Sequence, residues 1–188
     1  MIIFISGLAL FFAPHVYSAV RPRASERDVK ARLGKGVYMG LYSLVSAAGL
    51  GLLVYGYWSS PALGALYVSL TETRLIVHGA MLVALVLIVA AYAPANHIRQ
   101  RLRHPMVLAI AIWAGSHLTL STDVKELLLF GSFLLYAVVD GISAFKRPYV
   151  QEDAARVHND VLVIVLAGGI YGMLVLWLHP VLFGAPVL

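Results

Sequence analysis

The chain has no cysteine, and charged residues make up only 12% of its 188 residues. The absence of cysteine excludes disulfide bonds, thiolate metal ligands and cysteine nucleophiles. The scarcity of charge is equally informative, because soluble domains carry about 25% charged residues. Hydrophobic residues account for 61% of the chain, which is more than the core of one soluble domain needs. The composition therefore indicates a membrane protein.

The hydrophobic residues lie in long blocks rather than in alternating stripes. Six blocks with almost no charge run through residues 1–20, 36–71, 75–95, 105–122, 127–144 and 161–188. A helix needs roughly 20 apolar residues to cross a hydrocarbon core about 30 Å thick. We therefore predict an all-α, polytopic bundle in a lipid bilayer. Its six transmembrane helices are expected at residues 2–20, 37–58, 74–93, 104–120, 125–145 and 160–183, in a single membrane domain over residues 1–188.

Positive charges are concentrated on alternate loops between these predicted spans. Of the 14 Lys and Arg, six lie at residues 21–35, three at residues 99–103 and three at residues 146–156. The two intervening loops hold only Arg74 and Lys125. Because cytoplasmic loops are enriched in Lys and Arg, this pattern predicts that both termini are non-cytoplasmic. The net charge of +5 then serves topology, and we expect no nucleic acid as a partner.

Histidine is the main candidate for chemistry in so apolar a chain. Four of the seven histidines lie inside the predicted spans or at their edges: His15, His78, His104 and His117. Ionisable side chains at membrane depth are costly and are functional candidates. Imidazole is the commonest metal ligand in proteins, and two histidines from different helices at one depth would hold a b-type haem. The alternative for each is a structural hydrogen bond to a neighbouring helix.

Depth in the membrane favours particular pairs of these histidines. The rise of about 1.5 Å per residue places His15 and His104 toward the cytoplasmic side. The same estimate places His78 and His117 toward the outer side. Depth therefore couples His15 with His104 and His78 with His117. His104 and His117 are about 20 Å apart along one helix, so they do not share one iron unless that helix breaks.

Asp140 is the one carboxylate well inside a predicted span. Such a group is expensive in the membrane unless it is paired. Two interpretations remain open. Asp140 orients a ligating histidine by accepting its other ring N–H, or it forms an ion pair with Arg21 or Arg103 at the interface.

Several motifs together resemble the NnrU family of bacterial membrane proteins. They are Gly40-Leu-Tyr-Ser-Leu-Val-Ser-Ala-Ala-Gly-Leu50, Ala90-Ala-Tyr-Ala-Pro-Ala-Asn-His-Ile-Arg99, Arg103-His104-Pro105-Met106, and Trp113 with His117 at fixed spacing. Asp140 also fits the pattern. The resemblance covers residues 1–147, and the last span at residues 160–183 is expected to be an addition. It implies a bacterial inner membrane protein connected with denitrification and nitric oxide.

NnrU proteins are similar to 15-cis-zeta-carotene isomerase, a membrane protein that carries haem b. That isomerase has an Arg-His-Pro motif whose pattern matches His104, Trp113 and His117, and a first-span histidine that matches His15. The resemblance thus implies His15 and His117 as haem ligands, whereas depth suggests His78 as the partner of His117. Ala114 stands where the isomerase has cysteine, so thiolate ligand exchange is excluded here.

The leading hypothesis is therefore a membrane-embedded b-type haem protein. It would act in redox chemistry, in nitric oxide handling or as an isomerase of a lipophilic small molecule, alone, as a homo-oligomer or with a redox partner. A second hypothesis is a membrane methyltransferase relative in which Arg103 and His104 bind S-adenosylmethionine. Glu152 and Asp153 are poor substitutes for the acidic pair of those enzymes. A third hypothesis is a cofactor-free accessory subunit of a membrane complex.

Overall fold

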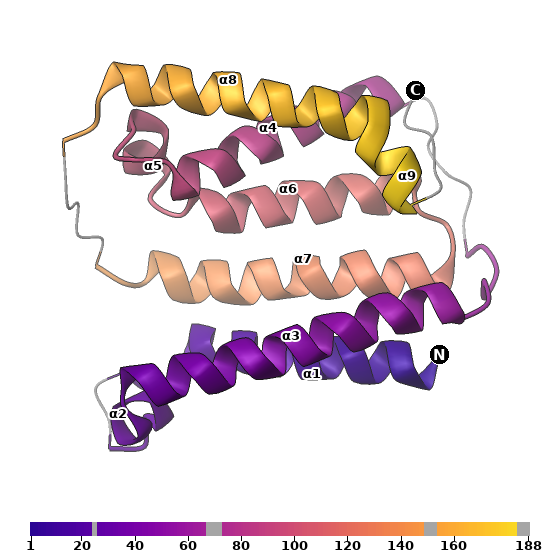
Figure 1. Cartoon of the computed structure of the whole chain (residues 1–188), viewed down its shortest axis with the longest axis horizontal. Coiled ribbons are helices and arrows are strands. Elements are labelled where there is room, and N and C mark those ends of the chain that lie inside the picture. Colours follow the sequence, from indigo (N-terminus) through magenta and orange to yellow (C-terminus); the bar gives the residue numbers. More distant parts are fainter. Residues whose placement is uncertain (24–25, 67–72, 149–153, 184–188) are drawn as a thin grey trace. The chain divides into compact units, whose positions relative to one another are not determined.

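The computed structural model describes residues 1–23, 26–66, 73–148 and 154–183. Over these residues the chain is helical, with no β-strand apart from an isolated bridge between Ala65 and Asp123. The longer helices are α1 (Ile2–Val20), α3 (Lys35–Ser59), α4 (Arg74–Tyr92), α6 (Pro105–Leu120), α7 (Val124–Phe145) and α8 (Val157–Met173) (Figure 1). The short ones are α2 (Val29–Leu33), α5 (His97–Leu102), the π-helical turn η2 (Leu174–Leu178) and α9 (His179–Phe183).

Five helical segments of the described chain are long and apolar enough to cross a membrane. They are α1, α3, α4, α7 and the continuous segment α8–η2–α9 (Val157–Phe183). The remaining apolar helix, α6, has 16 residues, which is about 24 Å. These segments are those of an all-α, multi-pass membrane protein, as predicted. Every predicted span is a helix, with ends within three residues of those expected, although five spans rather than six reach the expected length.

The chain divides into two compact units. Unit 1 comprises Met1–Ser69 and Ser121–Lys146, and it holds α1, α2, α3 and α7. Unit 2 comprises Leu70–Leu120 and Arg147–Leu188, and it holds α4, α5, α6, α8, η2 and α9.

In unit 1, α1 and α3 pack side by side with their backbones in contact (Figure 1). A Cβ atom at Gly7 would lie 2.3 Å from the backbone nitrogen of Leu53. At Gly49 it would lie 2.4 Å from the backbone nitrogen of Phe11, and Gly56 is equally close to α1. Because only glycine tolerates this approach, these positions set the distance between the two helices. Small residues at a helix interface are typical of membrane packing.

The segment that follows α3 in unit 1 is fastened to the start of α7 by Asp123. One carboxylate oxygen accepts the backbone N–H of Lys125 at 2.8 Å, capping α7. The other accepts the N–H groups of Leu63 at 2.8 Å and Gly64 at 3.1 Å. These bonds, that of Lys125 foremost, hold the pKa of Asp123 below its ordinary value, because each favours the charged carboxylate.

In unit 2, α4 packs against both α6 and α8. The turn from α4 to α5 is built around Asn96, which is fully buried. Its amide nitrogen donates to the carbonyl oxygens of Ala90 at 2.9 Å and Pro94 at 3.0 Å. Its side-chain oxygen accepts the N–H of Arg99 at 2.8 Å and caps α5. The turn therefore returns the chain directly toward α6.

The end of the last helical segment departs from regular α-helix. The turn η2 precedes α9, and Pro180 is the second residue of α9. Because Pro180 has no N–H to donate to the carbonyl of Leu176, the regular pattern cannot continue through this point. Such π-turns often lie near functional sites. Neither this turn nor the short helices α2 and α5 were predicted.

Candidate functional site

His15 lies on α1 within an aromatic cluster of unit 1. Its Nδ1 is 2.6 Å from the carbonyl oxygen of Phe11, four residues earlier. The imidazole stacks on the ring of Phe11, with centroids 4.3 Å apart. It also contacts the rings of Tyr42 at 5.0 Å and Tyr136 at 5.8 Å. Side chains from α1, α3 and α7 thus fix the position of the ring.

Asp140 lies on α7 one helical turn beyond Tyr136. The Tyr136 hydroxyl donates to Asp140 Oδ2 at 3.5 Å, a long hydrogen bond. Since the Tyr136 ring also contacts His15, Asp140 reaches the histidine through the tyrosine. Of the two cationic partners considered above, Arg21 forms an ion pair with Asp28, and Arg103 belongs to unit 2.

His117 lies near the end of α6 and shows the same backbone arrangement as His15. Its Nδ1 is 2.9 Å from the carbonyl oxygen of Trp113, four residues earlier, and the two rings are 5.2 Å apart. In both histidines the carbonyl can only accept, so in the neutral imidazole Nδ1 carries the proton and Nε2 the lone pair. Metal-ligating histidines have the same arrangement, in which one nitrogen donates to a carbonyl and the other ligates.

His78 lies in the first turns of α4 and is bonded to Tyr171 of α8. Its Nδ1 is 2.8 Å from the Tyr171 hydroxyl. That hydroxyl donates to the backbone carbonyl of His78 at 3.2 Å, so the imidazole N–H donates to the hydroxyl oxygen. This is the structural hydrogen bond to a neighbouring helix that the sequence analysis gave as the alternative for His78.

His104 stands at the start of α6, immediately before Pro105. Its carbonyl oxygen accepts the N–H of Leu108 at 3.4 Å, and its Nε2 is buried. The preceding Arg103 has a positive φ of 61°, which turns the chain sharply into the helix. Through its backbone carbonyl, His104 therefore begins the first turn of α6.

The candidate residues divide between the two units. His15 and Asp140 belong to unit 1, and the other three histidines belong to unit 2. Because α6 is one unbroken helix, His104 and His117 lie at its opposite ends, as predicted. Among the residues that the structure describes, no three or more His, Asp or Glu side chains gather in a metal-binding group.

His179 belongs to unit 2 with His117, although the sequence analysis did not single it out. It begins α9, directly after the π-turn, and its ring packs on Phe183 with centroids 5.0 Å apart. The irregular end of the last segment therefore determines where this histidine lies. Periodicity gave no signal for this, because it assumes a continuous α-helix.

A second contact missed from the sequence joins α5 to α8 in unit 2. Asp160 accepts the backbone N–H of His97 at 2.8 Å and pairs with His97 Nδ1 at 2.6 Å. The amide of Asn159 donates to the carbonyl of Ala95 at 2.8 Å. These bonds fasten the turn around Asn96 to the start of α8. His97 and Asp160 are 63 residues apart, and no local pattern connects them.

No curated protein and no solved structure matches the chain. The family described as NnrU protein matches residues 3–187. This match extends past residue 147, where the resemblance noted from the sequence ended, and it includes the last helical segment. With all but three residues of the chain covered, the protein belongs to the NnrU family.

Proposed function

We propose that this protein crosses the bacterial inner membrane six times, with α6 as the fourth span and both termini non-cytoplasmic. The charge pattern of the loops supports this orientation. A backbone hydrogen bond supports the count, since the N–H of Leu66 donates to the carbonyl of Thr122 at 3.0 Å. The end of α3 and the start of α7 therefore lie on one side. If α4 crosses the membrane between them, α6 must cross back, and tilting or local thinning of the bilayer accommodates its length.

Within this frame, the protein is proposed to be a membrane-embedded b-type haem protein with His117 as an axial ligand. The observation that carries the proposal is the bond from Nδ1 of His117 to the carbonyl of Trp113, which leaves the lone pair on Nε2. The donor set fits haem iron, because neutral imidazole is a common axial ligand. When bound, haem would supply one-electron chemistry and a site for a small ligand such as nitric oxide.

The second ligand is left open between His15 and His78, of which His78 lies in the same unit as His117. His15 has the same bond to the carbonyl four residues earlier as His117 has, and the resemblance names the same residue. The imidazole N–H of His78 is directed to Tyr171, which serves to join α4 and α8. Tyr136, with Asp140 bonded to its hydroxyl, holds the His15 ring in place.

The test is the absorption spectrum of the detergent-purified full-length protein, oxidised and then reduced with dithionite. We expect a Soret band that shifts on reduction and is lost in His117→Ala, and its loss in either His15→Ala or His78→Ala identifies the second ligand. His158→Ala is the control, because that histidine is exposed at the start of α8. Nitric oxide added to the reduced protein is expected to shift the band again.

A colourless protein, also after expression with added haem, would overturn the haem assignment. A spectrum lost in His78→Ala and unchanged in His15→Ala would make His78 the second ligand, and the reverse result would make it His15.

A further inference from the structure

The short helix α2 displays basic side chains beside exposed aliphatic ones. Lys30 and Arg32 lie on α2, and Lys35 is the first residue of α3. Arg32 and Lys35 are exposed, and Lys30 is partly exposed. Val29 and Leu33 are 38% and 42% exposed. Being four residues apart, they lie on one side of the helix. We call these five residues the α2 surface.

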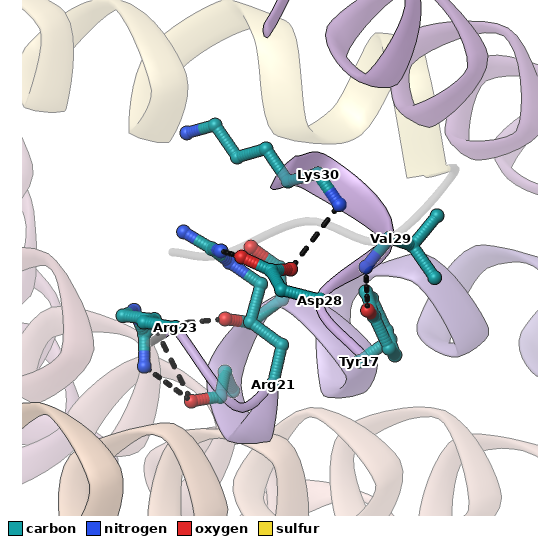
Figure 2. Close-up of polar contacts among 8 residues, drawn as sticks. Tyr17, Arg21, Arg23, Asp28, Val29 and Lys30 are labelled. Carbon is teal, nitrogen blue, oxygen red and sulfur yellow. Dashed lines mark hydrogen bonds and ion pairs between the residues drawn. The ribbon is translucent and has the colours of Figure 1, made fainter. Parts of the chain in front are cut away.

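The α2 surface is held in a fixed position against the end of α1 (Figure 2). Asp28 is almost fully buried and forms an ion pair with Arg21. Its carboxylate also accepts the N–H of Lys30 at 3.1 Å and caps α2. The N–H of Val29 donates to the Tyr17 hydroxyl at 2.9 Å. A five-residue helix is unstable alone, so these bonds are what present its basic side chains together.

Two arginines that follow α1 are bonded inside the fold, whereas the basic side chains of the α2 surface are not. Arg21 is satisfied by Asp28, and the guanidinium of Arg23 donates to the carbonyl oxygen of Ser18 at 2.9 Å, at the end of α1 (Figure 2). Lys30 Nζ lies 6.0 Å from the ring centroid of Tyr38, a weak cation–π distance. The basic groups of the α2 surface therefore remain available to an external anion.

The position of the α2 surface selects the kind of anion. It connects α1 and α3, two helices apolar enough to cross the membrane. At the ends of these two helices, Val20 on α1 and Val37 on α3 are also exposed, at 58% and 56%. Aliphatic side chains beside Lys and Arg are typical of helices at the level of lipid headgroups. Clusters of basic residues next to a membrane span attract anionic lipids.

We propose that the α2 surface binds the headgroup phosphate of an anionic phospholipid, with Lys30, Arg32 and Lys35 around the phosphate. Val29 and Leu33 then contact the upper acyl chains of the same lipid. The binding requires the insertion of α1 and α3 in the membrane but not the haem, so the two proposals fail independently.

The experiment measures retained lipid on the full-length protein. Protein reconstituted with phosphatidylglycerol and phosphatidylcholine is released into mild detergent, and bound lipids are counted by native mass spectrometry. We expect selective retention of phosphatidylglycerol, and about 30-fold weaker binding in the Arg32→Gln/Lys35→Gln variant, since each basic residue near the surface contributes about 1 kcal/mol. Neither side chain takes part in the bonds described above that hold α2 against the end of α1. The variant is therefore expected to keep the thermal stability of the parent.

The matched control removes two exposed arginines of other basic loops, Arg101→Gln and Arg156→Gln. This variant loses the same charge and is expected to retain phosphatidylglycerol like the parent. Equal losses in both variants would show a general charge effect and would overturn the assignment to the α2 surface. Equal retention of both lipids by the parent, or displacement of phosphatidylglycerol by inorganic phosphate, would also overturn it.

Discussion

At the scale of single residues, polar groups in this apolar chain are placed by short-range bonds to the backbone. Imidazoles on α1 and α6 bond to carbonyls four residues earlier, and the carboxylate of Asp123 accepts three backbone N–H groups. For the two imidazoles, each bond removes a desolvation cost that would be several kcal/mol in the membrane. The removal of a buried polar group that lacks such a bond should therefore not lower the free energy of unfolding.

Two tyrosines of unit 1 test this argument directly. The Tyr17 hydroxyl accepts the N–H of Val29, whereas the buried Tyr38 hydroxyl has no hydrogen-bond partner in the part of the chain that the structure describes. We expect Tyr17→Phe to lower the free energy of unfolding by about 1 kcal/mol, and Tyr38→Phe to leave it unchanged or raise it by a similar amount. Thermal unfolding of the two purified variants provides the comparison. Equal destabilisation by both substitutions would contradict the prediction.

The residues of the candidate site differ in how far the sequence could predict them. His15 and His117 stand out because histidine is rare and costly in apolar spans. Tyr136 and Tyr171 give no such signal, since tyrosine is common at membrane interfaces. Their roles depend on which helix faces share a contact, and a single sequence does not contain that information.

At the scale of helices, the lengths of the apolar blocks predicted the six long segments, because the hydrocarbon thickness imposes them. The five-residue α2 and the six-residue α5 were missed because their sequences show neither apolar length nor a helical period. They are specified by the side-chain caps of Asp28 and Asn96. The close packing of α1 on α3 depends on glycines of both helices, which the lengths of the apolar blocks did not single out.

Gly49 and Gly51 on α3 separate a packing role from helix propensity. A Cβ at Gly49 would lie 2.4 Å from the backbone of α1, whereas nothing lies within 4 Å of one at Gly51. We expect Gly49→Ala to lower the free energy of unfolding by about 1–3 kcal/mol, as overpacking does. Gly51→Ala should leave it unchanged or raise it by up to about 1 kcal/mol. Thermal unfolding of both variants provides the measurement. A Gly49→Ala variant as stable as Gly51→Ala would contradict the close packing of α3 on α1 at this position.

At the scale of the whole molecule, the distribution of charge supports the proposed orientation of the helices in the membrane. Three basic loops alternate with two loops that hold one basic residue each. The bridge between Ala65 and Asp123 places the two weakly charged loops together in the fold. The charge pattern and the hydrogen bonding therefore agree on which ends of the helices belong to one side, although they depend on different residues.

The absence of cysteine makes this orientation directly measurable, because an introduced thiol is the only one in the chain. Arg101 precedes α6 and Thr122 follows it. With a membrane-impermeant maleimide, we expect Thr122→Cys to react in intact cells and Arg101→Cys only after permeabilisation, because α6 separates the two positions. Ala62→Cys, in the exposed segment after α3, is the positive control for the outer side, and the cysteine-free parent sets the background. If both positions flanking α6 reacted only after permeabilisation, α6 would not cross the membrane and the protein would have five spans.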